Sequence, residues 1–133
     1  MRLHPYIDAA GIPSIGYGST YYENGTKVRV KDKKISKARA VDLLTKNIKS
    51  YEKTVRDSVI SDINQNQFDA LVSLSYNIGS YAFQKSGLLK LVNNNPQDLN
   101  ISKRFMLWNK SNHVTLKSLT IRRSLESDLY FKY

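Results

Sequence analysis

Apolar residues recur at helical spacing through most of the chain, beginning after position 36. Steps of three and four residues between apolar positions are typical of a helix with one buried face. Ser36 suits the N-cap of the first such helix, because its side chain can accept a backbone hydrogen bond from the first turn. The pattern predicts that one apolar stripe of this helix faces a core, formed by Val41, Leu44, Ile48, Tyr51 and Val55.

Four further helices are predicted from the same spacing and from residues that begin or end helices. The third of these reaches Phe105 and Trp108, and the last carries Ile121, Leu125 and Leu129. The residues expected at the helix ends are Asn64 or Asn66 and Gly79 for the first, Ser86 for the second, and Pro96 in the first turn of the third.

The first thirty residues have a different pattern, in which glycines lie among Tyr, Ile, Val and Ser. Asn24-Gly25 is a strong turn signal. Lys27 to Lys31 alternates strictly between charged and apolar residues, as a half-exposed strand does. Residues 12–31 are therefore predicted to form a small antiparallel sheet of two or three short strands. With the helices that follow, this predicts an α+β fold.

The length of 133 residues fits a single domain, with a sheet-containing lobe of about residues 1–35 and a helical lobe of about residues 36–133. The chain lacks cysteine, has no apolar core of a signal peptide after Met1, and has no uncharged run long enough to span a membrane. We therefore expect a soluble protein made in the cytoplasm. Its formal net charge of +10 favours anionic partners, namely nucleic acid, acidic membrane surfaces or cell-wall polymers. A nucleic-acid recognition motif is missing, so nucleic acid is not the expected partner.

The residue types exclude several kinds of chemistry. With no cysteine and only His4 and His113, we expect no metal site, no Ser-His triad and no cofactor. Asp8 precedes the glycine-rich segment Ser14-Ile15-Gly16-Tyr17-Gly18, whose glycines allow a ligand or another backbone to come close. Two interpretations remain open from spacing alone: Asp8 caps a turn, or it belongs to a ligand site.

Three blocks of sequence resemble the phage lysozymes and endolysins of glycoside hydrolase family 24. The first runs from Arg2 through Tyr6, Asp8, Gly11 and Ser14 to Gly18. The second comprises residues 66–79 and continues through Phe83, Ser86 and Trp108, and the third is Leu119-x-x-Arg122-Arg123-x-x-Glu126. The blocks cover nearly the whole chain in the family's order. The resemblance implies a lysozyme-like fold with a small antiparallel N-terminal sheet and a mainly helical body.

The resemblance also implies a function: hydrolysis, with inversion, of the β-1,4 bond between N-acetylmuramic acid and N-acetylglucosamine in bacterial peptidoglycan. It assigns the water-activating roles to Asp8 and Ser14, where Ser14 replaces the family's Thr. Arg122 matches a basic position near the catalytic Glu, and the aromatic ring of Tyr17 is a candidate for stacking on a sugar. The expected partner is peptidoglycan, and the expected place of action is the bacterial cell wall.

The chain departs from the family's pattern at the general acid. The matching Glu would lie three positions before Arg2, ahead of Met1, and Glu23 is the remaining acidic candidate near the hairpin. Three expectations stay open: a truncated lysozyme, a variant with another proton donor, or a pseudo-lysozyme that binds cell-wall glycan without cleaving it. A partner segment that covers the place of the missing N-terminal helix is a further expectation.

Overall fold

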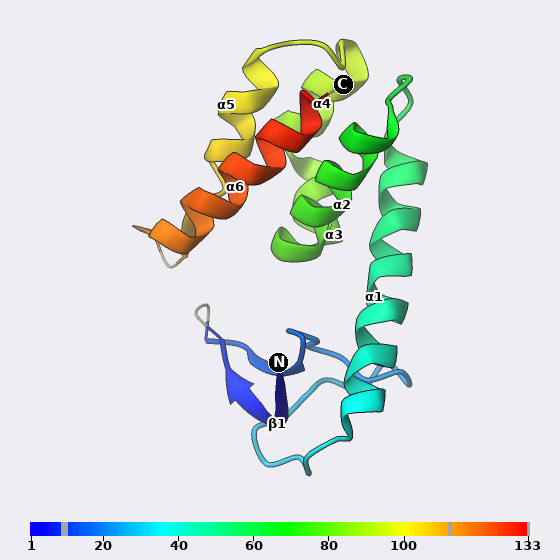
Figure 1. The fold of residues 1–133 in the computed structure, drawn as a ribbon, viewed down its shortest axis with the longest axis vertical. Helices are drawn as coiled ribbons and strands as arrows, with labels where there is room; N and C mark the ends of the chain where they lie inside the picture. Colours follow the sequence, from blue (N-terminus) through cyan, green and yellow to red (C-terminus); the bar gives the residue numbers. More distant parts are fainter. Residues whose placement is uncertain (9–10, 112, 133) are drawn as a thin grey trace. The chain divides into compact units, whose positions relative to one another are not determined.

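The structure is a computed structural model that describes residues 1–8, 11–111 and 113–132. It consists of two compact units, Met1–Ser50 and Tyr51–Tyr133. The first unit contains the sheet and the second is mainly helical (Figure 1). The predicted α+β, lysozyme-like fold class is confirmed. The boundary between the units lies inside a helix, whereas the two lobes were expected to meet near residue 35; that the whole chain is one domain stays a prediction.

The sheet of the first unit is a β-hairpin. Strand β1 (Arg2–Ile7) pairs antiparallel with β2 (Pro13–Gly16), with Tyr6 opposite Ser14. The prediction of a small antiparallel sheet is confirmed, but it placed the start too late, because β1 begins at Arg2. The predicted strand over Lys27 to Lys31 is wrong. The segment forms one isolated bridge, between Lys27 and Tyr21, and then turns because the Asp32 carboxylate accepts the backbone N–H of Arg29 at 2.7 Å.

The first unit has its own small core, made by Ile15, Val28, Ile35, Ala40 and Leu43. Gly16 lies at the closest approach between the hairpin and the helix that follows. A Cβ atom at Gly16 would lie 3.1 Å from the Cβ of Ala40, and the backbone φ of Gly16 is 65°. Both facts favour glycine at this position, because other residues rarely adopt a positive φ.

Helix α1 (Lys37–Ser58) begins where Ser36 was expected to cap it, since the Ser36 hydroxyl accepts the backbone N–H of Arg39 at 3.1 Å. The predicted apolar stripe is only partly right. Val55 is buried, but Val41 is 43% exposed and Ile48 is 36% exposed. The prediction assumed one continuous core along the helix. Each end of α1 instead buries the residues that pack within its own unit: Ala40 and Leu43 in the first, and Val55 in the second.

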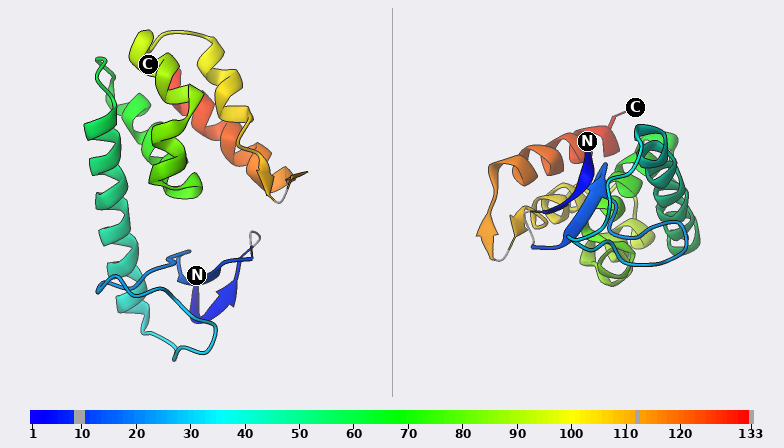
Figure 2. Two further views of the ribbon diagram at one scale, coloured as in Figure 1. Left: turned by 180° about the vertical axis from the view of Figure 1, so that it is seen from behind. Right: turned by 90° about the horizontal axis from the view of Figure 1, so that it is seen from below.

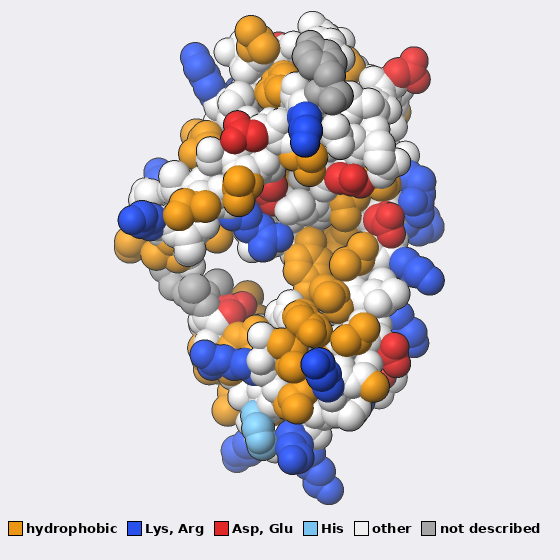
Figure 3. Space-filling model, in the orientation of Figure 1, with side chains coloured by type: hydrophobic (Ala, Val, Ile, Leu, Met, Phe, Trp, Pro, Cys, Tyr) orange, Lys and Arg blue, Asp and Glu red, His pale blue; other side chains and the backbone are white. Residues whose placement is uncertain are grey.

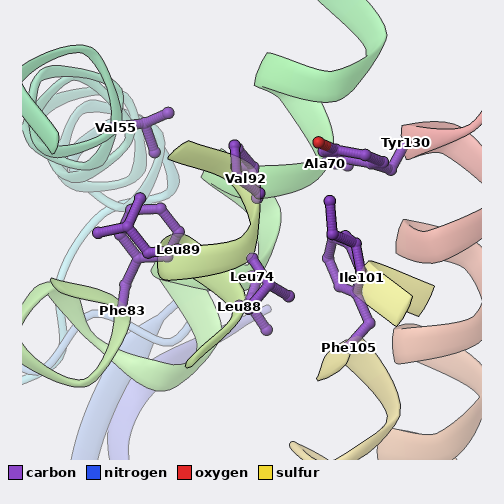
Figure 4. Close-up of a cluster of buried hydrophobic side chains, with 11 residues drawn as sticks. Val55, Ala70, Leu74, Phe83, Leu88, Leu89, Val92, Ile101, Phe105 and Tyr130 are labelled. Atoms are coloured by element: carbon purple, nitrogen blue, oxygen red, sulfur yellow. The ribbon is translucent and has the colours of Figure 1, made fainter. Parts of the chain in front are cut away.

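In the described part of the second unit, helices α2 to α6 and the C-terminal end of α1 surround a hydrophobic core. α2 contacts both α6 and α3, and α5 contacts both α4 and α6 (Figures 1 and 2). The core includes Leu74, Phe83, Leu88, Phe105 and Tyr130 (Figure 4). The elements are α2 (Gln65–Ile78), α3 (Ser80–Lys85), α4 (Gly87–Asn94), α5 (Asn100–Met106), β3 (Lys110–Ser111), β4 (Val114–Thr115) and α6 (Lys117–Tyr130).

The helix ends in this unit follow the expected capping residues with one exception. Asn64 caps α2, Gly79 ends it with a φ of 95°, and Ser86 caps α4. Pro96 was expected in the first turn of the next helix, but α5 begins later, at Asn100. The carbonyl of Pro96 instead accepts a hydrogen bond from the hydroxyl of Tyr130 at 2.7 Å. The segment around Pro96, which was predicted to be helical, therefore forms the turn after α4 and contacts Tyr130.

Candidate active site

Asp8 and Ser14 meet across the loop of the N-terminal hairpin. The Ser14 hydroxyl lies 3.4 Å from Oδ2 of Asp8, and Oδ1 of Asp8 accepts the backbone N–H of Ile12 at 2.9 Å. The backbone N–H of Asp8 in turn donates to the carbonyl of Ile12 at 3.0 Å. The hydrogen bond from Ile12 therefore orients the carboxylate, and the catalytic roles expected of Asp8 and Ser14 stay a prediction.

The two residues differ in exposure in a way that suits a reactive pair. Ser14 is only 1% exposed and is held in the strand opposite Tyr6, while Asp8 is half-buried. The single proton of the Ser14 hydroxyl has two acceptors, Asp8 at 3.4 Å and the carbonyl of Ile12 at 3.2 Å. Because neither hydrogen bond is short, the hydroxyl is able to turn toward a water molecule beside the carboxylate.

Tyr17 follows the same strand directly and is 37% exposed. It lies between Gly16 and Gly18, both of which have a positive φ. The backbone thus turns sharply on both sides of this tyrosine and presents it at the end of the hairpin. Its expected role in contacting a sugar remains a prediction.

Glu23, the acidic candidate within the described residues of the first unit, is engaged in an ion pair. Its carboxylate lies 3.1 Å from Nη2 of Arg39 and also accepts from Nε of that residue. The hydrogen bond from Arg39 lowers the pKa of Glu23 below its usual value. A general acid needs the opposite shift, because it must keep its proton near neutral pH. The ion pair with Arg39 therefore favours the charged form of Glu23, and its expected role as proton donor stays a prediction.

Arg122 lies in the second unit, on α6, at the edge of a buried polar network. Its side chain is 40% exposed, and its Nε lies 3.4 Å from Oε2 of Glu126. Its Nη2 lies 3.4 Å from the carbonyl of Ser73 on α2. Arg122 therefore helps to join α6 to α2. A role in supporting the active site stays a prediction.

The centre of this network is an ion pair between Arg123 and Glu126, whose side chains are 0% and 4% exposed. Nε of Arg123 lies 2.6 Å from Oε1 of Glu126, and Nη2 lies 2.9 Å from Oε2. Nη1 of Arg123 donates to the amide oxygen of Asn77 at 2.7 Å and to the carbonyl of Trp108 at 3.3 Å. Burial lowers the pKa of Arg123, and the charge of Glu126 opposes this shift. One buried pair thus links α6 to α2 and to the segment after α5.

Within the described residues, the structure has no helix that is both long and apolar enough to cross a membrane.

Comparison with known proteins gives one consistent result. Residues 1–126 match a protein-family model described as phage lysozyme. The endolysin of Salmonella phage P22 is 37% identical over 111 residues, which cover 83% of this chain and 74% of that protein. The endolysin of Bacillus phage PZA is 34% identical over 117 residues; the match covers 88% of this chain but only 43% of that longer protein. Among solved structures, the endolysin from Escherichia coli O157:H7 phage FAHEc1 has a TM-score of 0.82 at 33% identity, covering 98% of this chain and 84% of that one.

Proposed function

Because this chain belongs to the phage lysozyme family, we propose that it acts as an endolysin that hydrolyses bacterial peptidoglycan. The bond cleaved is the β-1,4 linkage between N-acetylmuramic acid and N-acetylglucosamine. Asp8 and Ser14 act on the water, and the protein works at the cell wall after synthesis in the cytoplasm. The observation that carries the proposal is the contact between the Asp8 carboxylate and the buried Ser14 hydroxyl, at the hairpin position where the family's motif places its catalytic residues.

The geometry suits a carboxylate that activates water. In inverting hydrolysis one carboxylate removes a proton from water on one face of the sugar, while an acid on the other face protonates the leaving oxygen. The N–H of Ile12 holds one oxygen of Asp8, and the second oxygen faces Ser14. A water molecule that donates a hydrogen bond to Asp8 and accepts one from Ser14 keeps its second lone pair free. The two hydrogen bonds fix the direction in which that lone pair points toward the sugar. Orientation of this kind lowers the entropic cost of the attack.

The acid side of the reaction is assigned by resemblance to a Glu, at a position three residues before Arg2 and ahead of the printed sequence. We propose that this Glu lies on a helical segment that packs against residues 1–133. That segment either precedes Met1 in the same chain or belongs to a partner. Arg122 is proposed to support that acid. Loss of a general acid costs about 10² to 10⁴ in rate, so the residues described here by themselves should cleave only slowly.

The test counts new reducing ends released from purified peptidoglycan. Four proteins are compared: the chain as printed, its Asp8→Asn variant, the chain extended by a helix bearing Glu at the family's position, and the same extension bearing Gln. We expect strong cleavage by the Glu extension, and little by the printed chain or the Gln extension. Adding Asp8→Asn to the Glu extension should abolish its activity, because the water then lacks its base.

Two outcomes would contradict the proposal. If the Glu extension folds, as judged by circular dichroism, yet releases no reducing ends, the chain is not a muramidase. If Asp8→Asn leaves cleavage unchanged, the base is a different residue. Binding to the cell wall without cleavage by any of the proteins would favour the alternative of a pseudo-lysozyme that retains glycan binding.

A further inference from the structure

A cavity of about 420 Å³ opens in the first unit next to the Asp8–Ser14 pair. We call it the Lys27–Arg29 pocket; its lining consists of Ile12, Pro13, Thr20, Tyr21, Lys27, Val28 and Arg29. Ile12 connects the pocket to the pair, because its N–H donates to Asp8 and its carbonyl accepts from Ser14. The pocket and the proposed water-activating pair thus share Ile12, although neither Asp8 nor Ser14 is among the residues that line the pocket.

The lining of the pocket combines two cations with apolar surface. Lys27 and Arg29 are exposed, while Val28 between them is only 4% exposed and packs in the core of the first unit. The exposure of Lys27 and Arg29 on either side of the buried Val28 places both cationic side chains on the side away from that core. Among the described lining residues none is acidic; the carboxylate that interacts with the Arg29 charge, Asp32, does not line the pocket. Tyr21 is 46% exposed and Ile12 is 48% exposed, which provides an apolar surface for the face of a sugar ring.

The backbone around the pocket is held in place by hydrogen bonds. The N–H of Val28 donates to the carbonyl of Thr20 at 2.9 Å, and Tyr21 and Lys27 form an antiparallel bridge. The carboxylate of Asp32 accepts the N–H of Arg29 at 2.7 Å and the hydroxyl of Tyr22 at 2.8 Å. The positions from which Lys27 and Arg29 extend are thus fixed before any ligand arrives, which reduces the ordering cost of binding.

We propose that the Lys27–Arg29 pocket binds the anionic group of an acidic glycan unit next to the bond that is cleaved. Arg29 and Lys27 contact the anion, and Tyr21 contacts the sugar. The inference rests on the proposed function, which supplies the glycan. A carboxylate of the muramic acid or its peptide, and a phosphate of an attached wall polymer, offer the same acceptor oxygens to a guanidinium and an ammonium group.

The test must separate this pocket from the general attraction of a basic protein for an acidic wall. Lys and Arg side chains occur at many other places on the surface (Figure 3). The test variant is the double substitution Lys27→Gln and Arg29→Gln. Its matched control is Lys33→Gln with Lys34→Gln, which removes the same charge from exposed residues of the same unit that do not line the pocket.

Binding is measured by pelleting with insoluble cell wall at low temperature and low salt. The three probes are peptidoglycan stripped of phosphate-containing polymers, the same material with its carboxyl groups amidated, and unstripped wall. On stripped peptidoglycan we expect the test variant to bind about tenfold more weakly than wild type, as for two charge-assisted contacts at a partly exposed site, and the control less than about twofold. On amidated material, wild type and the test variant should bind equally.

The outcomes decide both the pocket and the source of the anion. A difference on stripped peptidoglycan identifies a carboxylate, and a difference confined to unstripped wall identifies phosphate. The inference is overturned if both double variants weaken binding equally, or if neither weakens it on any probe. Reducing ends are counted in the same samples with the Glu-extended chain. Their absence alongside an intact binding difference would refute the hydrolase and leave the pocket standing.

Discussion

Replacing Glu126 by Gln would remove one charge from the buried network of the second unit and leave Arg123 charged and without its ionic partner. Arg123 is 0% exposed, so water cannot take the place of the lost carboxylate without a change in packing. Two of the guanidinium contacts, at 2.6 and 2.9 Å, go to Glu126. The two others go to Asn77 and to the carbonyl of Trp108, and these survive the substitution.

The expected loss in the free energy of unfolding follows from which of these contacts the substitution removes. Breaking a buried ion pair by removing one partner costs about 3 to 5 kcal/mol. The Gln side chain still offers one oxygen to the guanidinium, and Asn77 still accepts from it, so the lower end applies, about 3 kcal/mol. For a chain of this length that corresponds to a fall of about 10 °C in Tm.

The measurement is urea and thermal unfolding followed by tryptophan fluorescence. Trp108 is the single tryptophan and its carbonyl contacts Arg123, so the signal reports on the unit that contains the pair. The control is Asp57→Asn, which breaks the Lys53–Asp57 pair, whose side chains are 73% and 58% exposed. That pair should contribute at most about 0.5 kcal/mol.

A double variant that removes both charges of the pair provides a second test. The double variant Arg123→Met, Glu126→Leu removes both charges together and should recover much of the lost stability, because no unpaired buried charge remains. If Glu126→Gln costs less than about 1 kcal/mol, or if the double variant is less stable than Glu126→Gln, the pair does not hold the helices as we have argued.

Three further predictions concern the first unit. Ser14→Ala in the Glu-extended chain should lower kcat/KM by about tenfold, because one hydrogen bond to the water is lost, while Ser14→Thr should keep the activity; reducing-end release measures both. Burial and the hydrogen bond to Asp32 raise the pKa of Tyr22 to about 12 from 10.0, so wild type should lose stability relative to Tyr22→Phe as the pH rises from 10.0 through 12, with no such loss below 10.0, when Tm is measured against pH. Gly16→Ala should lower Tm, because alanine at a φ of 65° is strained and its Cβ would lie 3.1 Å from that of Ala40.

The features predicted correctly from the sequence are the local ones. Ser36, Asn64 and Ser86 all accept backbone hydrogen bonds at the starts of helices, and Gly79 ends one with a positive φ. A cap depends on residues within one turn of itself, so its signal is present in a short stretch of sequence. The starts of α1, α2 and α4 and the end of α2 follow from these signals.

The wrong predictions all involve a contact that is distant in sequence or a side chain that competes with the regular pattern. Pro96 does not begin a helix because its carbonyl is bound by Tyr130, 34 residues later. The alternation after Lys27 does not form a strand because Asp32 closes a turn onto Arg29. Ile48 lies between the two ends of α1 that contribute to different cores, and at the first end the buried positions are Ala40 and Leu43, which leaves Val41 on the exposed side.

The candidate site was accessible from the sequence only in part. Asp8 and Ser14 were found through a motif, and the structure gives their contact a geometric basis in the loop between β1 and β2. Arg123 and Glu126 belong to the third block of the resemblance, but neither that motif nor the hydrophobic spacing indicates that the two residues form a buried pair. On α6 the apolar residues Ile121 and Leu125 are 52% and 64% exposed, while the charged pair is buried, which reverses the usual pattern.

The net charge of +10 does not by itself show where this protein binds an anionic partner, because its arginines have different structural roles. Arg123 is neutralised inside the second unit, so its removal should affect stability and leave the attraction to an acidic wall nearly unchanged. Arg29 is exposed and lines the Lys27–Arg29 pocket, whose described lining residues include no acid, so its removal should affect binding and leave stability nearly unchanged. Arg39, paired with Glu23 at the surface, should affect neither by much. If all three substitutions weakened wall binding equally, the charge would act only as a diffuse field, and the pocket beside the hairpin would have no part in recognition.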